Sequence, residues 1–355
     1  MDFKQKLDYR FLGLKKKLIL PKILRPISKQ MTNQLKSNFD IDAVILWVDG
    51  SDEKHIQKLS QYVENKSLLD KKGFLTRYLQ VDEIEYCVKS IQRFAPYVRN
   101  IYIITDNQIP SFLKNQSNNS AFENVKIIDH KVIFEGFEQY LPTFNCYPIE
   151  TMMSRIPDLA EHFIYFNDDM FIVKDTKPTD FFTANGYPVL RGKWTNFDTN
   201  GFKEFLRKIG IKKRRISKVT YKKSQENSAR MLGMDRYLKV SHTPFPMRKS
   251  TFNDYLDKNS DIMINSIKHR FRDSSHFMIQ LHAAHLEILN NTYELKKNYN
   301  LVHFGSTEKS MLWIKSKLFL TEKDKSKLFV NIQSLDLYPK EKIDYILNWL
   351  DRILK

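Results

Sequence analysis

The chain has 355 residues, 42% of them hydrophobic and 13% aromatic, which suffices for one large α/β domain or two ordinary domains and excludes wholesale disorder. Its two cysteines, Cys87 and Cys146, exclude a disulfide framework and a multi-thiolate zinc site. The apolar runs are too short to cross a bilayer and we recognise no secretory signal. We therefore expect a cytoplasmic protein, either free or peripheral on the inner face of the cell membrane.

The net charge of +17 is concentrated in two segments. Residues 1–36 hold ten Lys or Arg against two acids, and residues 203–223 hold ten against one. A nucleic-acid-binding protein usually spreads positive charge through its folded module. The distribution therefore argues against nucleic acid as a partner and favours an anionic surface.

The first segment predicts a basic amphipathic helix. Apolar residues recur every three or four positions along it, at Phe3, Leu7, Phe11, Leu14 and Leu18. Two interpretations stay open: the helix makes a peripheral contact with an anionic membrane, or it docks on its own domain with its lysines in solvent.

Strand-like and helix-like segments alternate through the next part of the chain. Four apolar runs, each followed by a polar turn, predict strands at 41–48, 101–105, 125–128 and 163–166. Helical periodicity marks segments between them, including 84–94. We therefore expect an α/β fold with a mainly parallel, Rossmann-like (glycosyltransferase-A-like) sheet flanked by helices. Ligands of such sheets bind beyond the carboxyl ends of the strands.

The same patterns predict three parts of the chain. These are a basic amphipathic N-terminal arm (1–36), an α/β catalytic domain (37–310) and a helical C-terminal segment (311–355). Residues 192–240 form a basic, weakly periodic insertion in the second part. The final helix pattern, behind Pro339, favours packing against the core.

Adjacent carboxylates follow the fourth predicted strand. Asn167-Asp168-Asp169 stands at a strand-to-loop corner, where paired carboxylates can hold Mg²⁺ or Mn²⁺. The alternative is a pair of capping aspartates. We favour a metal or substrate site.

Two further loops carry groups suited to a phosphorylated ligand. Asp49-Gly50-Ser51-Asp52 follows the first strand, although an ordinary Asp-Gly turn explains it as well. Residues 141–145 open the helix that bears Glu150, so Thr143 and Asn145 are helix-capping groups or anion ligands. Neither a GxGxxG nor a GxxxxGK[ST] motif is present.

Histidine and arginine gather in residues 241–310. His282-Ala-Ala-His285 has metal-like spacing but lacks the glutamate of HExxH, so we expect core positions for these histidines. Arg270 and Arg272 flank Phe271, and their planar guanidinium groups suit phosphate oxygens.

Together these motifs resemble the Stealth family, which includes bacterial capsule and exopolysaccharide phosphotransferases and the catalytic part of animal N-acetylglucosamine-1-phosphotransferase. Residues 41–52 are similar to the family's first region. The second region is matched by Arg77 and by residues 82–91, 95–110, 141–145, 149–150, 155–157 and 163–171.

The likeness continues more loosely downstream. Residues 241–244 (Ser-His-Thr-Pro) are similar to the third region, whose histidine is a catalytic candidate. Residues 270–272 (Arg-Phe-Arg) are similar to a further element, with His276 where an acid is expected. Gln333-Ser334 replace the Asn-Asp pair that usually ends the fourth region.

The resemblance implies a sugar-1-phosphate transferase of capsular or exopolysaccharide synthesis. It would move hexose-1-phosphate from a UDP-hexose or UDP-N-acetylhexosamine to a hydroxyl of an oligosaccharide acceptor, free or lipid-linked, and release UMP. The first alternative is a metal-dependent nucleotide-sugar glycosyltransferase that releases UDP. The second, a nucleic-acid-binding protein, is disfavoured because the acids cluster where a phosphate polymer would be repelled.

The resemblance also implies roles for individual residues. Asp168 and Asp169 would hold Mg²⁺ or Mn²⁺, and Asp168 counts among the catalytic residues. His242 would act as the base, while Arg77 and Arg272 would face the developing charge on phosphorus. The substrate-binding candidates are Asp49, Gly50, Asp52, Thr143, Asn145, Glu150 and Arg270.

Overall fold

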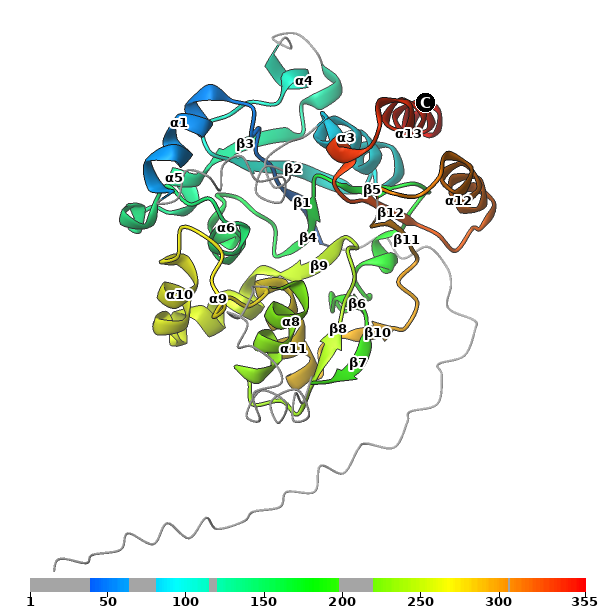
Figure 1. Cartoon of the computed structure of the whole chain (residues 1–355). Helices are drawn as coiled ribbons and strands as arrows, with labels where there is room; N and C mark the ends of the chain where they lie inside the picture. Colours follow the sequence, from blue (N-terminus) through cyan, green and yellow to red (C-terminus); the bar gives the residue numbers. More distant parts are fainter. Residues whose placement is uncertain (1–38, 64–80, 115–119, 198–219, 306) are drawn as a thin grey trace, which may run out of the picture. The chain divides into compact units, whose positions relative to one another are not determined.

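A five-stranded sheet stands at the centre of the computed structural model (Figure 1). The structure describes residues 39–63, 81–114, 120–197, 220–305 and 307–355, which belong to one compact unit, Lys36–Lys355. The predicted N-terminal arm, Arg77 and residues 203–219 of the second basic segment lie outside the described residues.

The central sheet has the strand order β3-β2-β1-β4-β9. Its first four strands run parallel, and β9 runs antiparallel to β4 at the edge. The predicted α/β fold with a mainly parallel sheet is therefore confirmed. The bounds are β1 (Ile41–Leu46), β2 (Val98–Thr105), β3 (Val125–Asp129), β4 (His162–Asn167) and β9 (Phe245–Arg248).

Helices cover both faces of this sheet, which explains why its strands read as continuous apolar runs. Ala43 and Ile45 of β1 belong to one core cluster, and Val44 between them belongs to the other. The first cluster includes α3 (Glu83–Phe94), α12 (Met311–Lys323) and α13 (Lys340–Leu354). The second includes α5 (His130–Ile133), α6 (Cys146–Met152), α9 (Lys249–Lys258), α10 (Ser260–Ile267) and α11 (Ile279–Leu289).

Smaller sheets and helices complete the unit. The order β11-β12-β5 joins Leu301–Phe304, Phe329–Ile332 and Met170–Ile172. The segment predicted as helical therefore also contains a strand, β12, which is buried along its length. The other pairs are β6 (Val189–Arg191) with β10 (Glu294–Lys296) and β7 (Lys193–Asn196) with β8 (Arg236–Lys239). Further helices are α1 (Glu53–Tyr62) and α4 (Ser111–Lys114).

The predicted basic insertion contains regular structure at both of its described ends. β7 pairs with β8, and α8 (Tyr221–Arg230) packs against β8 and α11. Ser224, Gln225 and Ser228 of α8 are buried. This part of the insertion is thus built into the fold.

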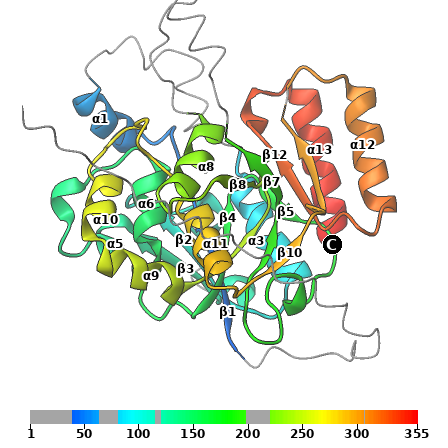
Figure 2. The same cartoon turned by 90° about the horizontal axis from the view of Figure 1, so that it is seen from below.

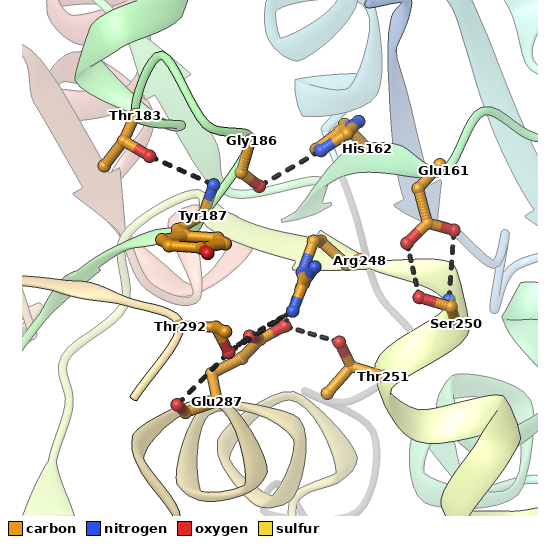
Figure 3. Close-up of polar contacts among 10 residues, drawn as sticks. All are labelled: Glu161, His162, Thr183, Gly186, Tyr187, Arg248, Ser250, Thr251, Glu287 and Thr292. Atoms are coloured by element: carbon orange, nitrogen blue, oxygen red, sulfur yellow. Dashed lines mark hydrogen bonds and ion pairs between the residues drawn. The ribbon is translucent and has the colours of Figure 1, made fainter. Parts of the chain in front are cut away.

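A polar network ties β9 to α11 at the end of the sheet remote from Asp168 (Figure 3). The guanidinium of Arg248 donates from Nε and Nη2 to Glu287, at 2.9 and 2.6 Å. Thr251 and Thr292 also donate to the Glu287 carboxylate, which is buried. Arg248, Thr251 and Thr292 together donate hydrogen bonds to both oxygens of the Glu287 carboxylate. This network therefore stabilises the position of α11 against the sheet.

We predict that Glu287→Ala lowers the free energy of unfolding by about 3–5 kcal/mol, because it leaves a partly buried arginine without its partner. Urea unfolding at neutral pH measures this. Ser250→Ala is the matched control, since its hydroxyl bonds the exposed Glu161 carboxylate and its loss should cost about 1 kcal/mol or less. Equal effects of the two substitutions would contradict the prediction.

None of the helices in the described ranges is both long and apolar enough to cross a membrane. The predicted core positions of His282 and His285 agree with their burial on α11. His285 Nε2 accepts the backbone N–H of Leu238 at 3.1 Å, which ties α11 to β8.

Candidate active site

A cavity of about 400 Å³ lies beyond the carboxyl ends of β1 and β4. These ends are side by side, because Leu46 pairs with Asn167 in the parallel register. Parallel sheets bind their ligands at this edge. Seven of the predicted site residues line the cavity: Thr143, Asn145, Glu150, Asp168, Asp169, His242 and Arg272.

Asp168 and Asp169 occupy the turn between β4 and β5, as predicted from the strand pattern. Burial raises the pKa of each to about 7, and the charge of Asp169 adds to the effect on Asp168. Glu83 at the start of α3 has its own pKa raised to about 7, first by burial and then by Asp168. Asp168 and Asp169 thus line the cavity as two neighbouring acids, and Glu83 interacts electrostatically with Asp168.

The same corner fits a divalent cation in one respect. Asp169 Oδ1 is buried and has no hydrogen-bond partner among the described residues, so a bound cation would satisfy it. Within those residues, no group of three His, Cys, Asp or Glu side chains forms a metal site. The chain would therefore hold a cation through Asp168 and Asp169, and the remaining ligands would come from substrate or water.

Glu150 and Tyr165 form a second polar group on the cavity wall. Tyr165 Oη lies 2.8 Å from Glu150 Oε1 and 2.6 Å from Asn167 Oδ1. Burial raises the pKa of Glu150. The carboxyl group of Glu150 is therefore held in place by β4, next to the aspartate corner.

Asn145 joins two loops beside the cavity. Its Oδ1 accepts the N–H of Tyr147 at 3.3 Å and so caps α6, as the capping interpretation predicts. Its Nδ2 donates to the carbonyl of Phe271 at 3.1 Å. Nearby, the N–H of Phe144 donates to the carbonyl of Arg270. These bonds connect residues 143–145 to residues 269–272.

The two arginines of that segment have different surroundings. Arg270 Nη1 donates to the carbonyl of Pro142 at 2.8 Å, and its guanidinium lies over the ring of Tyr62, outside the cavity lining. Arg272 lines the cavity, with Nη2 at 4.0 Å from Cys146 Sγ. The structure thus brings Arg272 to the site and uses Arg270 to hold the loop.

His242 reaches the cavity from the loop between β8 and β9. Its ring stacks on Tyr221 of α8, with centroids 4.6 Å apart, and on His303 of β11, with centroids 5.6 Å apart. Burial and the charge of His303 lower the pKa of His242 to about 4. The imidazole is therefore neutral at physiological pH and able to accept a proton.

The predicted loop after β1, which contains Asp49, Gly50 and Asp52, lies outside the cavity lining. Asp49 accepts the N–H and the hydroxyl of Ser51 at 2.9 and 2.6 Å, and Asp52 caps α1 by accepting the N–H of His55. Asp49, Gly50 and Asp52 do not line the cavity, whereas the preceding Trp47 and Val48 do.

The lining also includes polar residues that the sequence analysis did not predict as site residues, among them Tyr165, Tyr221, Gln280 and Gln333. Gln333 follows β12, so the segment that departs from the Stealth fourth region still reaches the site. Tyr165 is buried on β4 between Ile164 and Phe166, and its hydroxyl within an apolar run was the available signal. Tyr221 and Gln280 lie on helices whose positions no local pattern specifies.

Comparison with known proteins agrees with these motifs. Residues 39–67 match conserved region 1 of the Stealth proteins, and residues 77–190 match conserved region 2. The chain thus carries two conserved regions of the Stealth family. The second region ends at β6 and includes the Asp168-Asp169 corner, so the family match covers the central part of the cavity.

Two of the curated relatives of this chain are bacterial phosphotransferases. The exopolysaccharide phosphotransferase cps2G of Lactiplantibacillus plantarum is 43% identical over 42% of this chain and 41% of its own length. The capsular polysaccharide phosphotransferase fcs1 of Haemophilus influenzae is 32% identical over 69% of this chain and 64% of its own length. The chain thus spans about 41% to 64% of these two relatives.

Among solved structures, the galactosyltransferase LgtC in complex with donor and acceptor sugar analogs matches 88% of this chain and 95% of its own. The TM-score is 0.39 and the sequence identity 12%.

Proposed function

We propose that this chain transfers hexose-1-phosphate from a UDP-sugar to a hydroxyl of a glycan acceptor during capsule or exopolysaccharide synthesis, with release of UMP. One observation carries the proposal: a single cavity brings together the Asp168-Asp169 pair, the Arg272 guanidinium and the neutral His242 imidazole. Phosphoryl transfer needs this combination of cation binding, fixed positive charge and a base. The names of the curated relatives support it.

In this proposal the acceptor oxygen attacks the phosphorus that carries the sugar. The bond from that phosphorus to the bridging oxygen breaks, and UMP leaves with the bridging oxygen. His242 takes the proton of the attacking hydroxyl, and Arg272 faces the charge that develops on the phosphoryl oxygens. Thr143, Asn145 and Glu150 are placed to bind the donor sugar or the acceptor.

Asp168 and Asp169 are the residues that would hold Mg²⁺ or Mn²⁺. A divalent cation at this position would neutralise pyrophosphate charge. Both aspartates line the cavity beyond the end of β4, and the Glu83 carboxyl, which interacts electrostatically with Asp168, would add to the attraction for a positive occupant. Arg77, proposed as a second fixed cation, lies outside the described residues.

The bond that breaks distinguishes this proposal from a metal-dependent glycosyltransferase. We expect that a UDP-sugar labelled with ³²P at the phosphorus next to the sugar will pass its label to the glycan product and yield unlabelled UMP. The measurement is separation of nucleotide and glycan products for a panel of UDP-sugars, with an oligosaccharide acceptor present or omitted. Label that stays in UDP, with a phosphate-free glycosidic product, would establish the glycosyltransferase instead.

A further inference from the structure

The outer helix α12 has apolar residues on two sides. Ile314 and Leu318 are buried in the core. Leu312, Phe319 and Leu320 lie on the other side and are 74%, 58% and 59% exposed. Their spacing places all three on one stripe of the helix. In Figures 1 and 2, α12 stands at the edge of the drawn unit, beyond α13.

The surroundings of this stripe are basic. The other exposed positions on α12 are Lys315, Ser316 and Lys323, none of them acidic. Residues 309–327 contain six lysines and two acids. One of the acids, Glu322, is turned toward α13, where it accepts the indole N–H of Trp349 at 2.7 Å and pairs with Arg352.

Lysine ammonium groups also lie over aromatic rings of this region. Lys323 Nζ is 5.4 Å from the ring centre of Phe319, and Lys315 Nζ is 5.3 Å from that of Tyr345. Long basic side chains arranged in this way keep their charged ends beside an apolar surface. The stripe is therefore an apolar face with positive charge along its edges.

These features favour an anionic lipid surface over a second protein. Three apolar side chains on one helix cover much less than the roughly 1,000 Å² that a stable protein interface buries. Two copies of this chain meeting through α12 would also bring their lysines together. A lipid surface needs only a shallow apolar face and rewards each nearby lysine.

We propose that the exposed face of α12, defined by Leu312, Phe319 and Leu320 with Lys315 and Lys323, docks the protein on anionic lipid. The apolar side chains enter the boundary between headgroups and acyl chains, and the lysines meet the phosphates. The residues of this surface belong to a different part of the sequence from the basic N-terminal arm. The proposal that they bind lipid does not depend on the reaction proposed above.

The test uses the full chain and vesicles of phosphatidylcholine, either pure or mixed with phosphatidylglycerol. We expect wild type to bind the mixed vesicles more tightly. Leu312→Ser with Phe319→Ser and Leu320→Ser should lower the partition coefficient by at least about tenfold. Lys315→Gln and Lys323→Gln should each lower it by about fivefold. The N-terminal arm is unchanged in every variant. The partition coefficient of a variant divided by that of wild type therefore reports the contribution of α12 alone.

The matched control is Ile109→Ser with Leu289→Ser, which removes side chains that are 50% and 56% exposed elsewhere on the surface. It should bind vesicles as wild type does. Vesicle binding by the α12 variant equal to that of wild type would overturn the proposal. Sedimentation of wild type as a dimer that the α12 variant abolishes, with vesicle binding unchanged, would overturn it in favour of self-association.

A second measurement does not depend on the triple variant and therefore stays informative if that variant is unstable. Leu320→Trp adds a fluorophore at the exposed face, and lipids brominated on their acyl chains should quench it beyond the quenching of wild type. Leu289→Trp serves as the control and should show no added quenching. Equal quenching of the two variants would contradict insertion of α12.

Discussion

Replacing Asp168 or Asp169 with asparagine should reduce turnover by several powers of ten while the protein stays folded. The reason is that a bound cation and its ligands supply several kcal/mol of charge stabilisation in phosphoryl transfer. The carboxylates contribute little to the core, since burial raises the pKa of both to about 7. The measurement is the rate of label transfer at saturating Mg²⁺, with thermal unfolding recorded in parallel.

Glu161→Gln is the matched control, because it removes an exposed acid from the residue that precedes β4, at the strand's opposite end. It should leave turnover within about twofold of wild type, as surface changes outside a site usually do. Near-normal activity in both aspartate variants would place the cation site elsewhere.

The aspartate pair also predicts how stability depends on pH in metal-free buffer. Because the pKa of Asp168 and Asp169 is about 7 in the folded chain against an ordinary 3.8, the native state binds more protons between these values. The free energy of unfolding should therefore fall as the pH rises through this window. Asp169→Asn should flatten the dependence, and Mg²⁺ should restore stability above pH 7 in wild type but not in the variant.

Replacing His242 with alanine should slow product formation by roughly 10²–10⁴-fold, the range expected for loss of a general base. Donor binding should change little, because the ring is stacked between Tyr221 and His303 and carries no charge at neutral pH. Exogenous imidazole should restore part of the rate in the alanine variant. A rate within threefold of wild type would exclude His242 as the base.

The pH profile tests the same role independently. At saturating Mg²⁺, which keeps the Asp168-Asp169 pair ionised, kcat/KM should hold steady as the pH falls to about 5 and then decline as His242, with its pKa lowered to about 4, becomes protonated. This acid limb should vanish in His242→Ala. His303→Asn should move the limb to higher pH, because it removes the neighbouring charge that lowers the pKa of His242.

The sequence by itself located four of the five strands of the central sheet. Residues 41–48, 101–105, 125–128 and 163–166 were predicted as strands, and the structure has strands at Ile41–Leu46, Val98–Thr105, Val125–Asp129 and His162–Asn167. Short, β-branched apolar runs that end at polar turns favour buried strands of a parallel sheet over helices. The same pattern placed Asp168 and Asp169 at a strand end.

Only the tertiary structure decided which polar groups meet. Arg270 and Arg272 are equivalent in sequence, yet one binds the carbonyl of Pro142 and the other lines the cavity. Glu83 influences Asp168 because α3 packs beside β5, and Tyr221 supports His242 because α8 packs beside β8. Periodicity is a local property of the chain, whereas these contacts depend on strand order and helix docking, which arise from burial of the whole core.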